Sequence, residues 1–390
     1  MVVLWLGGWL VTLPVALITA IFALEAISGV WPPRNRSRCK LSNYTAAVVI
    51  PAQDEQKGIG KTINSLVPQL REGIRFLVVA DNCTDDTAVI ARRLGVEVIE
   101  RTDSERRGKG CALDFARRHL EANPPEVVII LDADCILESG SVEELISACA
   151  ERQVPAQCDN RLQPIRAEAL VEISSFAFYV KNSIRQLGMV RLGGPSLLTG
   201  TGMAFPWRLF KIADLAKGSV VEDLDLSIQF TKLGQSPILV PTARVWSDPA
   251  PLSATLSQRR RWEGGFLSTA IARAPSLLTQ ALTRHDWRCF WLALHLMVPP
   301  LALLALLGVA ALVVVASIAV ATKSASELAL LLGIQLLASS AVLAAWFRGG
   351  RAYLSGYSIL ALPIYVIWKI PLYLKIGRGA ASSWNRTDRA

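Results

Sequence analysis

Residues 127–134 read VVIILDAD, a run of apolar side chains that ends in two aspartates. A short run this rich in Val and Ile is typical of a strand that is buried on both faces of a sheet. Three earlier runs have the same character, and together the four predict the strands of one sheet. They are Ala46–Pro51, Phe76–Ala80, Val96–Glu100 and Val127–Leu131.

Helical patterns separate these predicted strands. Residues Ile59–Leu70, Thr84–Leu94 and Lys109–Leu120 have the apolar spacing of helices. Strands that alternate with helices predict an α/β domain of Rossmann-like type, in which a mostly parallel sheet has helices on both faces. Ligands of such sheets bind at the carboxyl ends of the strands, so the residues that follow each run are the first candidates for function.

The composition is that of a membrane protein. Of the 390 residues, 52% are apolar and 19% are charged, against about 25% charged residues in an ordinary soluble domain. These values exclude a disordered chain and argue against a purely soluble one. None of the seven cysteines forms a CxxC pair, which argues against a zinc site and fits thiols in a reducing cytosol.

Three stretches are long and apolar enough to span a bilayer, namely residues 1–31, Leu301–Ala321 and Leu328–Phe347. Basic residues follow the first and the last apolar stretch, as they do at cytosolic flanks. The net charge of +9 is therefore no sign of nucleic acid, since the chain has no basic patch with interleaved aromatics. We expect an uncleaved first helix with its amino end outside, and a multi-pass protein of the bacterial inner (plasma) membrane.

The segment Ala352–Ile376 has two interpretations. Pro363, Lys369 and Pro371 interrupt it, and a third C-terminal span would place the basic tail outside. We favour a re-entrant or interfacial segment over a span, and we interpret His285–Val298 as an interfacial helix. The chain then has four parts, an N-terminal membrane helix with its basic flank, a cytosolic α/β domain, interfacial and membrane helices, and a basic cytosolic tail, at residues 1–41, 42–284, 285–376 and 377–390.

Acidic residues follow the predicted strands. Asp81 ends the second run, and Asp132 and Asp134 follow the fourth. An i, i+2 pair in extended backbone points both carboxylates to one face, where a cation best offsets their repulsion. Carboxylate oxygens suit hard ions, so this pair predicts a Mg²⁺ or Mn²⁺ site that also holds substrate phosphates. For Asp85 and Asp86 we favour a structural role, as caps of the next helix.

Two further segments carry charged groups that are candidates for anion binding and for catalysis. Residues 106–110, RRGKG, open the third predicted helix, and their glycines let backbone N–H groups approach an anion. A solvated basic turn is the alternative. Residues 221–226, VEDLDL, place three acids in an apolar setting. Glu222 and Asp223 are the better catalytic candidates, and helix capping is the alternative role for Asp225.

Residues 258–262 read QRRRW in a stretch of helical character. Gln258, Arg261 and Trp262 stand at i, i+3 and i+4, so they share one face of the helix. A guanidinium can clamp a diphosphate, and an indole can support a sugar ring. The alternative is a basic helix that meets anionic lipid, which suits Arg259 and Arg260.

Taken in order, seven segments resemble the membrane-bound family 2 glycosyltransferases, the group of cellulose, chitin and hyaluronan synthases and of ceramide glucosyltransferase. The segments are VVIPAQDE (48–55), VVADNCTDDT (78–87), RRGKG (106–110), LDAD (131–134), TGTGMAF (199–205), VEDLDL (221–226) and QRRRW (258–262). They cover nearly all of the predicted cytosolic domain. The membrane portions match in character only.

The resemblance implies a GT-A fold and a role for each motif. The base and ribose of the nucleotide would contact Pro51, Ala52, Gln53, Glu55 and Asp81, with Lys109 close by. Asp132 and Asp134 would hold the diphosphate, directly and through Mg²⁺ or Mn²⁺. Asp223, beside Glu222, would be the general base. The leaving group and the acceptor end would contact Gln258, Arg261 and Trp262. One departure is Gln53-Asp54, where His-Asn or Tyr-Asn is more usual in the family.

The implied activity is inverting transfer of a sugar from a UDP-sugar to a lipid-linked or growing saccharide, in envelope or exopolysaccharide synthesis. Membrane lipid and polysaccharide-assembly proteins are the further partners that this activity implies. Two C-terminal spans are few for a polymer channel, so a single addition to a ceramide- or hopanoid-like lipid is the alternative. Two other classes stay open: a nucleotidyltransferase, which would not need the QRRRW segment, and a transporter or structural membrane protein with a degenerate domain.

Overall fold

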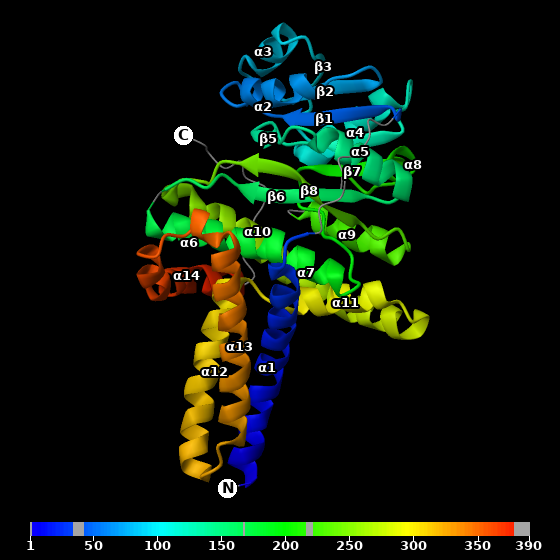
Figure 1. Ribbon diagram of the computed structural model, residues 1–390. Helices are drawn as coiled ribbons and strands as arrows, with labels where there is room; N and C mark the ends of the chain where they lie inside the picture. The colour runs from blue at the N-terminus through cyan, green and yellow to red at the C-terminus, as the bar shows by residue number, and fades with distance from the viewer. Residues whose placement is uncertain (1, 34–42, 167, 216–220, 378–390) are drawn as a thin grey trace. The chain divides into compact units, whose positions relative to one another are not determined.

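The computed structural model describes residues 2–33, 43–166, 168–215 and 221–377 (Figure 1). The predicted basic flank at 34–40 and the predicted tail beyond residue 377 lie outside these residues. Contacts between Cα atoms divide the chain into two units. We call residues 33–163 and 195–249 the sheet unit, and residues 1–32, 164–194 and 250–390 the helical unit. Each unit has a hydrophobic core of its own.

The sheet unit is built on one sheet of order β3-β2-β1-β4-β7-β6-β8-β5. The neighbours among β1 to β4 are parallel, as predicted, whereas β7 is antiparallel to β4 and β5 is antiparallel to β8. The strands are β1 (Ala46–Ala52), β2 (Ile74–Asp81), β3 (Glu97–Arg101), β4 (Val127–Ile130), β5 (Cys135–Leu137), β6 (Ala156–Leu162), β7 (Met203–Pro206) and β8 (Ile238–Ser247).

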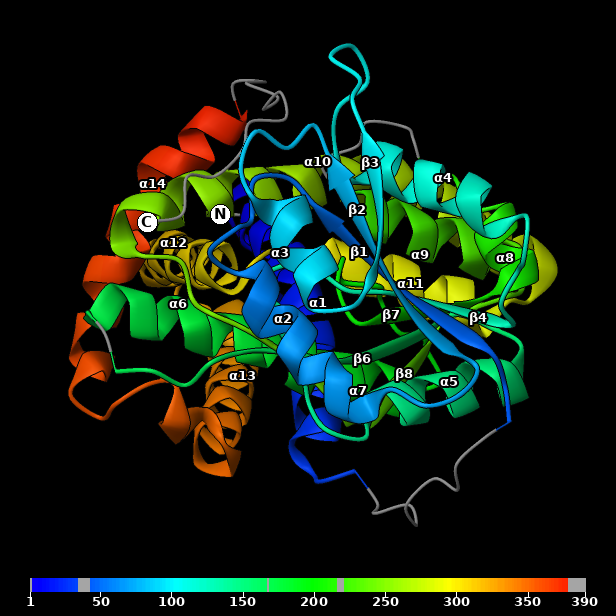
Figure 2. The same ribbon diagram turned by 90° about the horizontal axis from the view of Figure 1, so that it is seen from above.

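Helices cover both faces of this sheet, as the alternating sequence predicts (Figure 2). Val48 and Ile50 of β1 point to the core that α2 and α5 cover, and Ala47 and Val49 point to the core under α4, α8 and α9. The helices of the sheet unit are α2 (Ile59–Leu66), η1 (Val67–Gln69), α3 (Thr87–Arg93), α4 (Lys109–Leu120), α5 (Ser141–Arg152), α8 (Trp207–Lys211) and α9 (Glu222–Lys232). The burial of alternate side chains on both faces explains why the strands of this half read as unbroken apolar runs.

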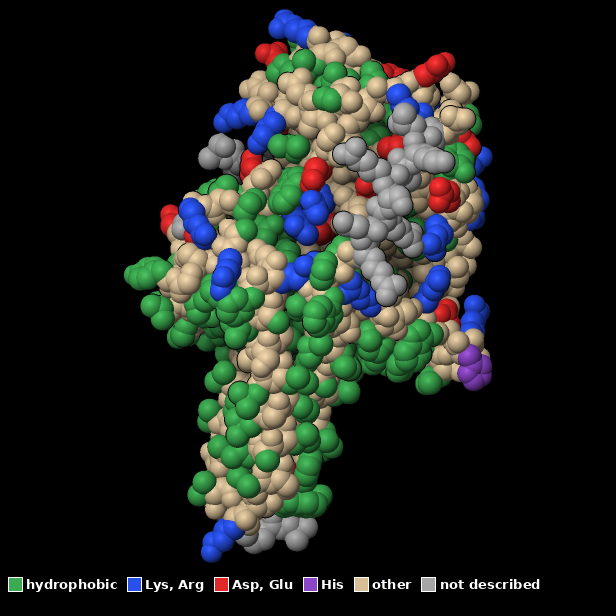
Figure 3. Space-filling view, viewed as in Figure 1, with side chains coloured by type: hydrophobic (Ala, Val, Ile, Leu, Met, Phe, Trp, Pro, Cys, Tyr) green, Lys and Arg blue, Asp and Glu red, His purple; other side chains and the backbone are tan. Residues whose placement is uncertain are grey.

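The helical unit contains a bundle of three long apolar helices, α1 (Val2–Val30), α12 (Leu301–Thr322) and α13 (Ser326–Arg348). Figure 3 shows hydrophobic side chains along the visible face of this bundle. Each of the three is long and apolar enough to cross a membrane. The segment Ser358–Gly377 also meets this criterion. The other helices are α6 (Ala169–Tyr179), the π-helix η2 (Val180–Arg185), α7 (Gln186–Arg191), α10 (Leu252–Arg284), α11 (Trp287–Met297), η3 (Gly350–Ala352), η4 (Ser358–Ala361) and α14 (Leu362–Gly377).

Helix α14 belongs to the ambiguous segment Ala352–Ile376. It contacts α6, α10 and α12. Figure 2 looks along α12 and α13 but shows α14 from its side, so α14 runs across the direction of the bundle. Lys369, in the middle of α14, is buried and pairs with Glu263 of α10. A crosswise helix is what an interfacial segment requires, and the number of spans stays a prediction.

Candidate active site

Functional groups gather at one edge of the sheet. The carboxyl ends of β1, β2 and β4 meet there, and the antiparallel β7 begins there. The edge therefore holds the predicted loop at 51–55, the Asp81 carboxylate, the DAD turn after β4 and the TGTG segment before β7. In parallel α/β sheets this is the edge that binds ligands.

The loops after β1 and β2 are joined to each other by hydrogen bonds. The backbone N–H of Glu55 donates to Thr87 Oγ1 over 2.8 Å, and the backbone N–H of Thr84 donates to Asp54 Oδ1 over 2.6 Å. The Cys83 thiol donates to the carbonyl of Ala52. These bonds hold the backbone of the predicted nucleotide loop, which contains Pro51, Ala52, Gln53 and Glu55, against the residues that follow Asp81.

The two aspartates before α3 differ in their contacts. Asp85 Oδ1 accepts a hydrogen bond from the backbone N–H of Thr87 over 3.0 Å, so Asp85 caps the first turn of α3. Asp86 occupies the N-cap position, but its side chain makes no capping hydrogen bond. The predicted capping role is confirmed for Asp85 and is wrong for Asp86.

Asp81 is buried and paired with a residue that the sequence motifs do not reveal. Arg101, which lies opposite Asp81 in the β2–β3 ladder, donates from Nη1 to Asp81 Oδ1 over 2.6 Å. Burial raises the pKa of Asp81, and the charge and hydrogen bond of Arg101 oppose this shift without cancelling it. Arg101 also holds Asp103 from Nη2 over 2.7 Å. One guanidinium thus orders the predicted base-binding acid and the loop that leads to Lys109.

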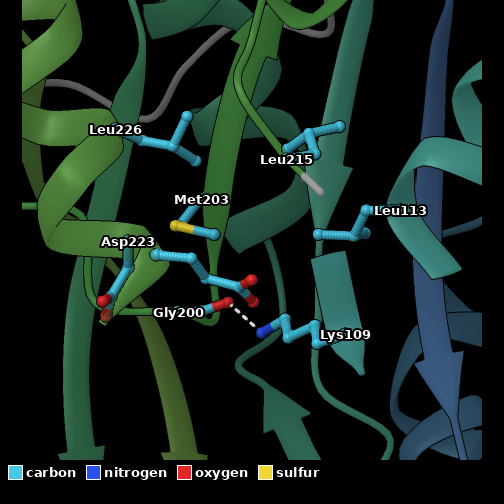
Figure 4. Close-up of a pocket in the computed structure, with 8 residues that line it drawn as sticks. Lys109, Leu113, Gly200, Met203, Leu215, Asp223 and Leu226 are labelled. Carbon is cyan, nitrogen blue, oxygen red and sulfur yellow. Dashed lines mark hydrogen bonds between the residues drawn. The ribbon is translucent and has the colours of Figure 1, made fainter. Parts of the chain in front are cut away.

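Lys109 is the first residue of α4, and its ammonium group connects three parts of the site. It donates hydrogen bonds to the Asp132 carboxylate and to the carbonyl of Gly200, and Figure 4 shows the second of these bonds. Burial lowers the pKa of this lysine, but the carboxylates of Asp132 and Glu222 outweigh burial and raise it. Lys109 therefore stays charged and neutralises part of the acidic cluster.

The two aspartates of the DAD motif lie in a turn after β4, not in the extended backbone that we expected. Their carboxylate oxygens and Cys135 Sγ nevertheless come within 4.8 Å of one another. Burial raises the pKa of the Cys135 thiol, so this group stays neutral, and the oxygens of Asp132 and Asp134 are the anionic donors. Two partly exposed carboxylates at a strand end fit a hard divalent cation.

A second group of possible ligand atoms, from Asp54, Cys83 and Asp85, fits a metal less well. Asp54 accepts hydrogen bonds from Thr84, and Asp85 accepts from the backbone of Gln56 and Thr87. Burial raises the pKa of the Cys83 thiol. The oxygens of this group already hold the loops together.

Glu222 and Asp223 stand at the start of α9 and line a small pocket with Lys109 and Gly200. Figure 4 shows the Asp223 side chain on the Gly200 side of this pocket, with Met203 and Leu226 above them in the view. Burial raises the pKa of Glu222 to about 7, Lys109 opposes the shift, and the charges of Asp223 and Asp132 add to it. Glu222 is therefore protonated in part near neutral pH.

The TGTG segment shapes the floor of the site. Thr201 Oγ1 accepts a hydrogen bond from the backbone N–H of Asp132 over 3.1 Å, which holds the DAD turn. Gly202 has a φ of +64°, and a Cβ at this position would lie 2.0 Å from Cys158 Sγ. Only glycine allows this close approach of the backbone to β6.

The QRRRW segment lies on α10, in the helical unit. Trp262 packs against Phe178 of α6, with 6.2 Å between ring centroids. Arg259 is buried, donates from Nε to Ser174 Oγ over 2.9 Å, and lies 5.4 Å from the Trp262 ring. The suggested role of Arg259 at a lipid surface is therefore wrong, because its guanidinium is used inside the protein. Gln258 and Arg261 are partly exposed on the same helix.

The fold and the site define a GT-A-like glycosyltransferase domain. A sequence model of the family described as "Glycosyltransferase like family 2" matches residues 44–265, more than half of the chain, and the chain belongs to this family. The match runs through the QRRRW segment.

Two further comparisons describe similar proteins. The 4,4'-diaponeurosporenoate glycosyltransferase of Staphylococcus aureus is 30% identical over 146 residues, which are 36% of this chain. The matched region spans only 37% of that relative. A mannosyltransferase of Pyrobaculum calidifontis, solved with GDP-Man and Mn²⁺, shares the fold over 95% of this chain and 98% of its own, with a TM-score of 0.54 and 18% identity.

Proposed function

We propose that this protein is an inverting glycosyltransferase of the bacterial inner membrane. It transfers a sugar from a nucleoside diphosphate sugar, UDP-sugar in our expectation, to an acceptor that reaches the site from the bilayer, and it forms a β-linkage. The observation that carries the proposal is the convergence of Lys109, Asp132, Glu222 and Asp223 at one sheet edge. Membership of the glycosyltransferase family supports it.

The donor would lie across the strand ends. Its base and ribose would contact the ordered loop at 51–55 and the Asp81 side chain, and its diphosphate would lie at the DAD turn. Asp132 and Asp134 would hold Mg²⁺ or Mn²⁺ there, and the bound cation would offset charge on the departing diphosphate. The solved mannosyltransferase with the same fold carries Mn²⁺ and GDP-Man, which supports a divalent cation and leaves the base of the nucleotide open to test.

The acids of α9 would supply the general base. Asp223 removes the proton of the acceptor hydroxyl while that oxygen attacks the anomeric carbon, and Lys109 keeps the acidic cluster from repelling the donor. A single base and a direct displacement invert the configuration at that carbon, so an α-linked donor gives a β-glycoside. Gln258, Arg261 and Trp262 would contact the leaving group and the acceptor end.

The acceptor would be a lipid or a lipid-linked saccharide. Four candidate membrane helices support a location at a bilayer, and a cytosolic catalytic domain would fit a cytosolic sugar nucleotide. The Staphylococcus aureus relative is named for a diaponeurosporenoate and not for a polysaccharide. This name favours a single addition to a lipid-like acceptor, with growth of an envelope saccharide, assisted by polysaccharide-assembly proteins, as the second candidate.

The test uses the full chain in detergent with Mn²⁺ or Mg²⁺, a panel of UDP- and GDP-sugars, and bacterial lipid extract. We expect release of nucleoside diphosphate from one donor, stimulation by lipid, and a loss of about 10²–10⁴ in rate in Asp223→Asn. A single product indicates one addition, and a ladder of products indicates polymer growth. Release of pyrophosphate, or no nucleotide binding at all, would contradict the proposal.

A further inference from the structure

The outer strands of the sheet carry polar side chains that the proposed reaction has not used. β6 reads AQCDNRL, and its pairing with β8 shifts between Cys158 and Asp159, which marks an irregularity of the β-bulge kind. Beyond the shift, Asp159 lies opposite Arg244 and Arg161 lies opposite Trp246. Residues two apart on a strand share a face, so these four side chains lie together. We call them the β6–β8 cluster.

The first pair in this cluster places a guanidinium over the face of an aromatic ring. The Arg161 guanidinium donates from Nε to Asp159 Oδ2 over 2.8 Å. Its Cζ lies 5.8 Å from the centre of the Trp246 ring. Asp159 is buried, whereas Arg161 and Trp246 are partly exposed. The planar guanidinium of Arg161 thus lies over an indole ring that is still partly exposed to solvent.

Glu138 binds both the indole N–H of Trp246 and the side chain of Arg244. Trp246 Nε1 donates to Glu138 Oε2 over 3.1 Å, and Arg244 Nη1 donates to Glu138 Oε1 over 3.3 Å. Arg244 Nε is buried and has no hydrogen-bond partner among the described residues. This N–H group is shielded from solvent and not satisfied by the described residues, an arrangement that costs free energy.

The chemistry of the cluster suits a neutral, hydroxyl-rich ring. The two arginines of the cluster are balanced in charge by Asp159 and by the neighbouring Glu138, so the cluster does not select an anion. Fixed planar carboxylate and guanidinium groups give directional hydrogen bonds, and a partly exposed indole gives an apolar platform. A sugar ring offers hydroxyl groups at its rim and C–H groups on its faces, and it needs both kinds of partner.

The cluster also lies next to the predicted diphosphate site. β5 starts at Cys135, directly after Asp134, and pairs with β8 so that Cys135 lies opposite Ser247 and Ile136 lies opposite Trp246. In the order β2-β1-β4-β7-β6-β8, the nucleoside is expected at β2 and β1 and the diphosphate at β4. A donor that continues in this direction presents its sugar toward β6 and β8.

We propose that the β6–β8 cluster is a subsite for a sugar ring, either the sugar of the donor or a sugar of the acceptor. This inference rests on the proposed function, and it identifies residues that select the sugar in the transfer reaction. Asp159 and Arg161 bind ring hydroxyls, and the face of Trp246 opposite Arg161 covers the ring. The cluster lies in the sheet unit alone.

The test changes the platform and the acid separately in the full chain with Mn²⁺. Trp246→Leu removes the ring, Trp246→Phe keeps an aromatic face, and Asp159→Asn removes the charge. Trp207→Leu and Asp114→Asn are the matched controls, since Trp207 is a partly exposed tryptophan on α8 and Asp114 is a buried, arginine-paired aspartate on α4. Calorimetry measures affinity for UDP, GDP and their sugars, and saturation-transfer NMR measures binding of methyl hexosides in the presence of UDP.

We expect Trp246→Leu and Asp159→Asn to keep the affinity for the free nucleotide. If these variants lose about tenfold of the preference for a nucleotide sugar over the free nucleotide, the cluster binds the sugar of the donor. A loss of methyl hexoside binding alone identifies an acceptor sugar. Trp246→Phe should retain most of either property, which separates a platform from a packing role and keeps the test valid if Trp246→Leu fails to fold.

Two outcomes overturn the inference, and they differ. If the wild-type chain binds nucleotide but the cluster variants match the control variants in every measurement, the subsite is wrong and the proposed function stands. If the wild-type chain binds no nucleoside diphosphate, the proposed function fails and the subsite fails with it.

Discussion

Lys109 donates a hydrogen bond to the Asp132 carboxylate, and this pair ties the start of α4 to the turn after β4. The same ammonium group is positively charged, so it does not repel a phosphate. The negative charges of Glu222 and Asp223 also act on it. The positive charge of Lys109 offsets the mutual repulsion of Asp132, Glu222 and Asp223. This relationship makes Lys109 the residue on which the electrostatics of the site depend.

We therefore predict that Lys109→Met lowers the transfer rate by about 10–100-fold, the range expected when a charge-assisted hydrogen bond is removed. Steady-state release of nucleoside diphosphate measures this loss. Lys61→Met is the control, because Lys61 forms an exposed ion pair with Asp248 in the same unit. Equal rates in the two variants would contradict the role given to Lys109.

Removal of one DAD carboxylate should change the metal requirement. We predict that Asp134→Asn raises the Mn²⁺ concentration for half-maximal activity by about tenfold or more, since one of two anionic ligands becomes neutral. Chelation should abolish activity in both the wild type and the variant. A titration of activity against Mn²⁺ measures the shift.

Asp85→Asn provides the contrast, because Asp85 belongs to the second group of possible ligand atoms. Its oxygens accept hydrogen bonds from the backbone of Gln56 and Thr87. We expect this variant to lose thermal stability and to keep its Mn²⁺ requirement. A shift of the requirement in Asp85→Asn, with none in Asp134→Asn, would move the metal to the other cluster.

The sequence alone predicted the half of the sheet whose strands are buried on both faces. Val48, Ile129 and their neighbours form unbroken apolar runs, because no side chain there meets water. β6 escaped prediction, since its second half carries Asp159 and Arg161 at the edge where ligands are expected. A strand that contains polar residues is not detected by a search for apolar runs.

The candidate site was predicted where neighbours in sequence carry the chemistry, as in DAD and VEDLDL. Arg101 was not found, because its partner Asp81 becomes visible only when the register of β2 and β3 is known. The same holds for the Trp246–Glu138 contact, which depends on the pairing of β5 with β8. Pairings between distant segments need the register, and a single sequence does not contain it.

The raised pKa of Glu222 predicts a pH-dependent stability. Its ordinary pKa is 4.5, and burial raises the pKa to about 7 in the folded protein. Between these two values the folded state holds a proton that the unfolded state has lost. Stability from this group is therefore present below about pH 4.5 and is lost as the pH rises to about 7.

Glu222→Gln removes this dependence, since an amide does not titrate. We expect the variant to match the wild type near pH 5 and to be the more stable of the two at pH 8, by up to about 3 kcal/mol. Thermal unfolding with chelator and without nucleotide measures the difference. A gap between the two proteins that does not change with pH would show that Glu222 titrates normally.

The buried pair in α14 gives a prediction for the helical unit. Lys369 Nζ contacts Glu263 Oε1, and the Tyr373 hydroxyl donates to Glu263 Oε2 over 2.9 Å. Lys369→Met leaves the buried carboxylate without its cation and should destabilise the protein by about 3–5 kcal/mol. Arg92→Met is the control, because its pair with Glu100 is exposed and should contribute less than about 1 kcal/mol.

Glu263→Gln is the second single variant of the cycle. The double variant Lys369→Met/Glu263→Gln completes it. We expect it to recover much of the loss, since neither buried group is then charged and the Tyr373 hydroxyl can still donate to the amide oxygen. Thermal unfolding in one detergent gives all three values. Because Glu263 follows Trp262 directly, the single variant should also raise KM for the acceptor, and the double variant should restore it in part. Additive losses in the two single variants would mean that the pair does not hold α14 to α10.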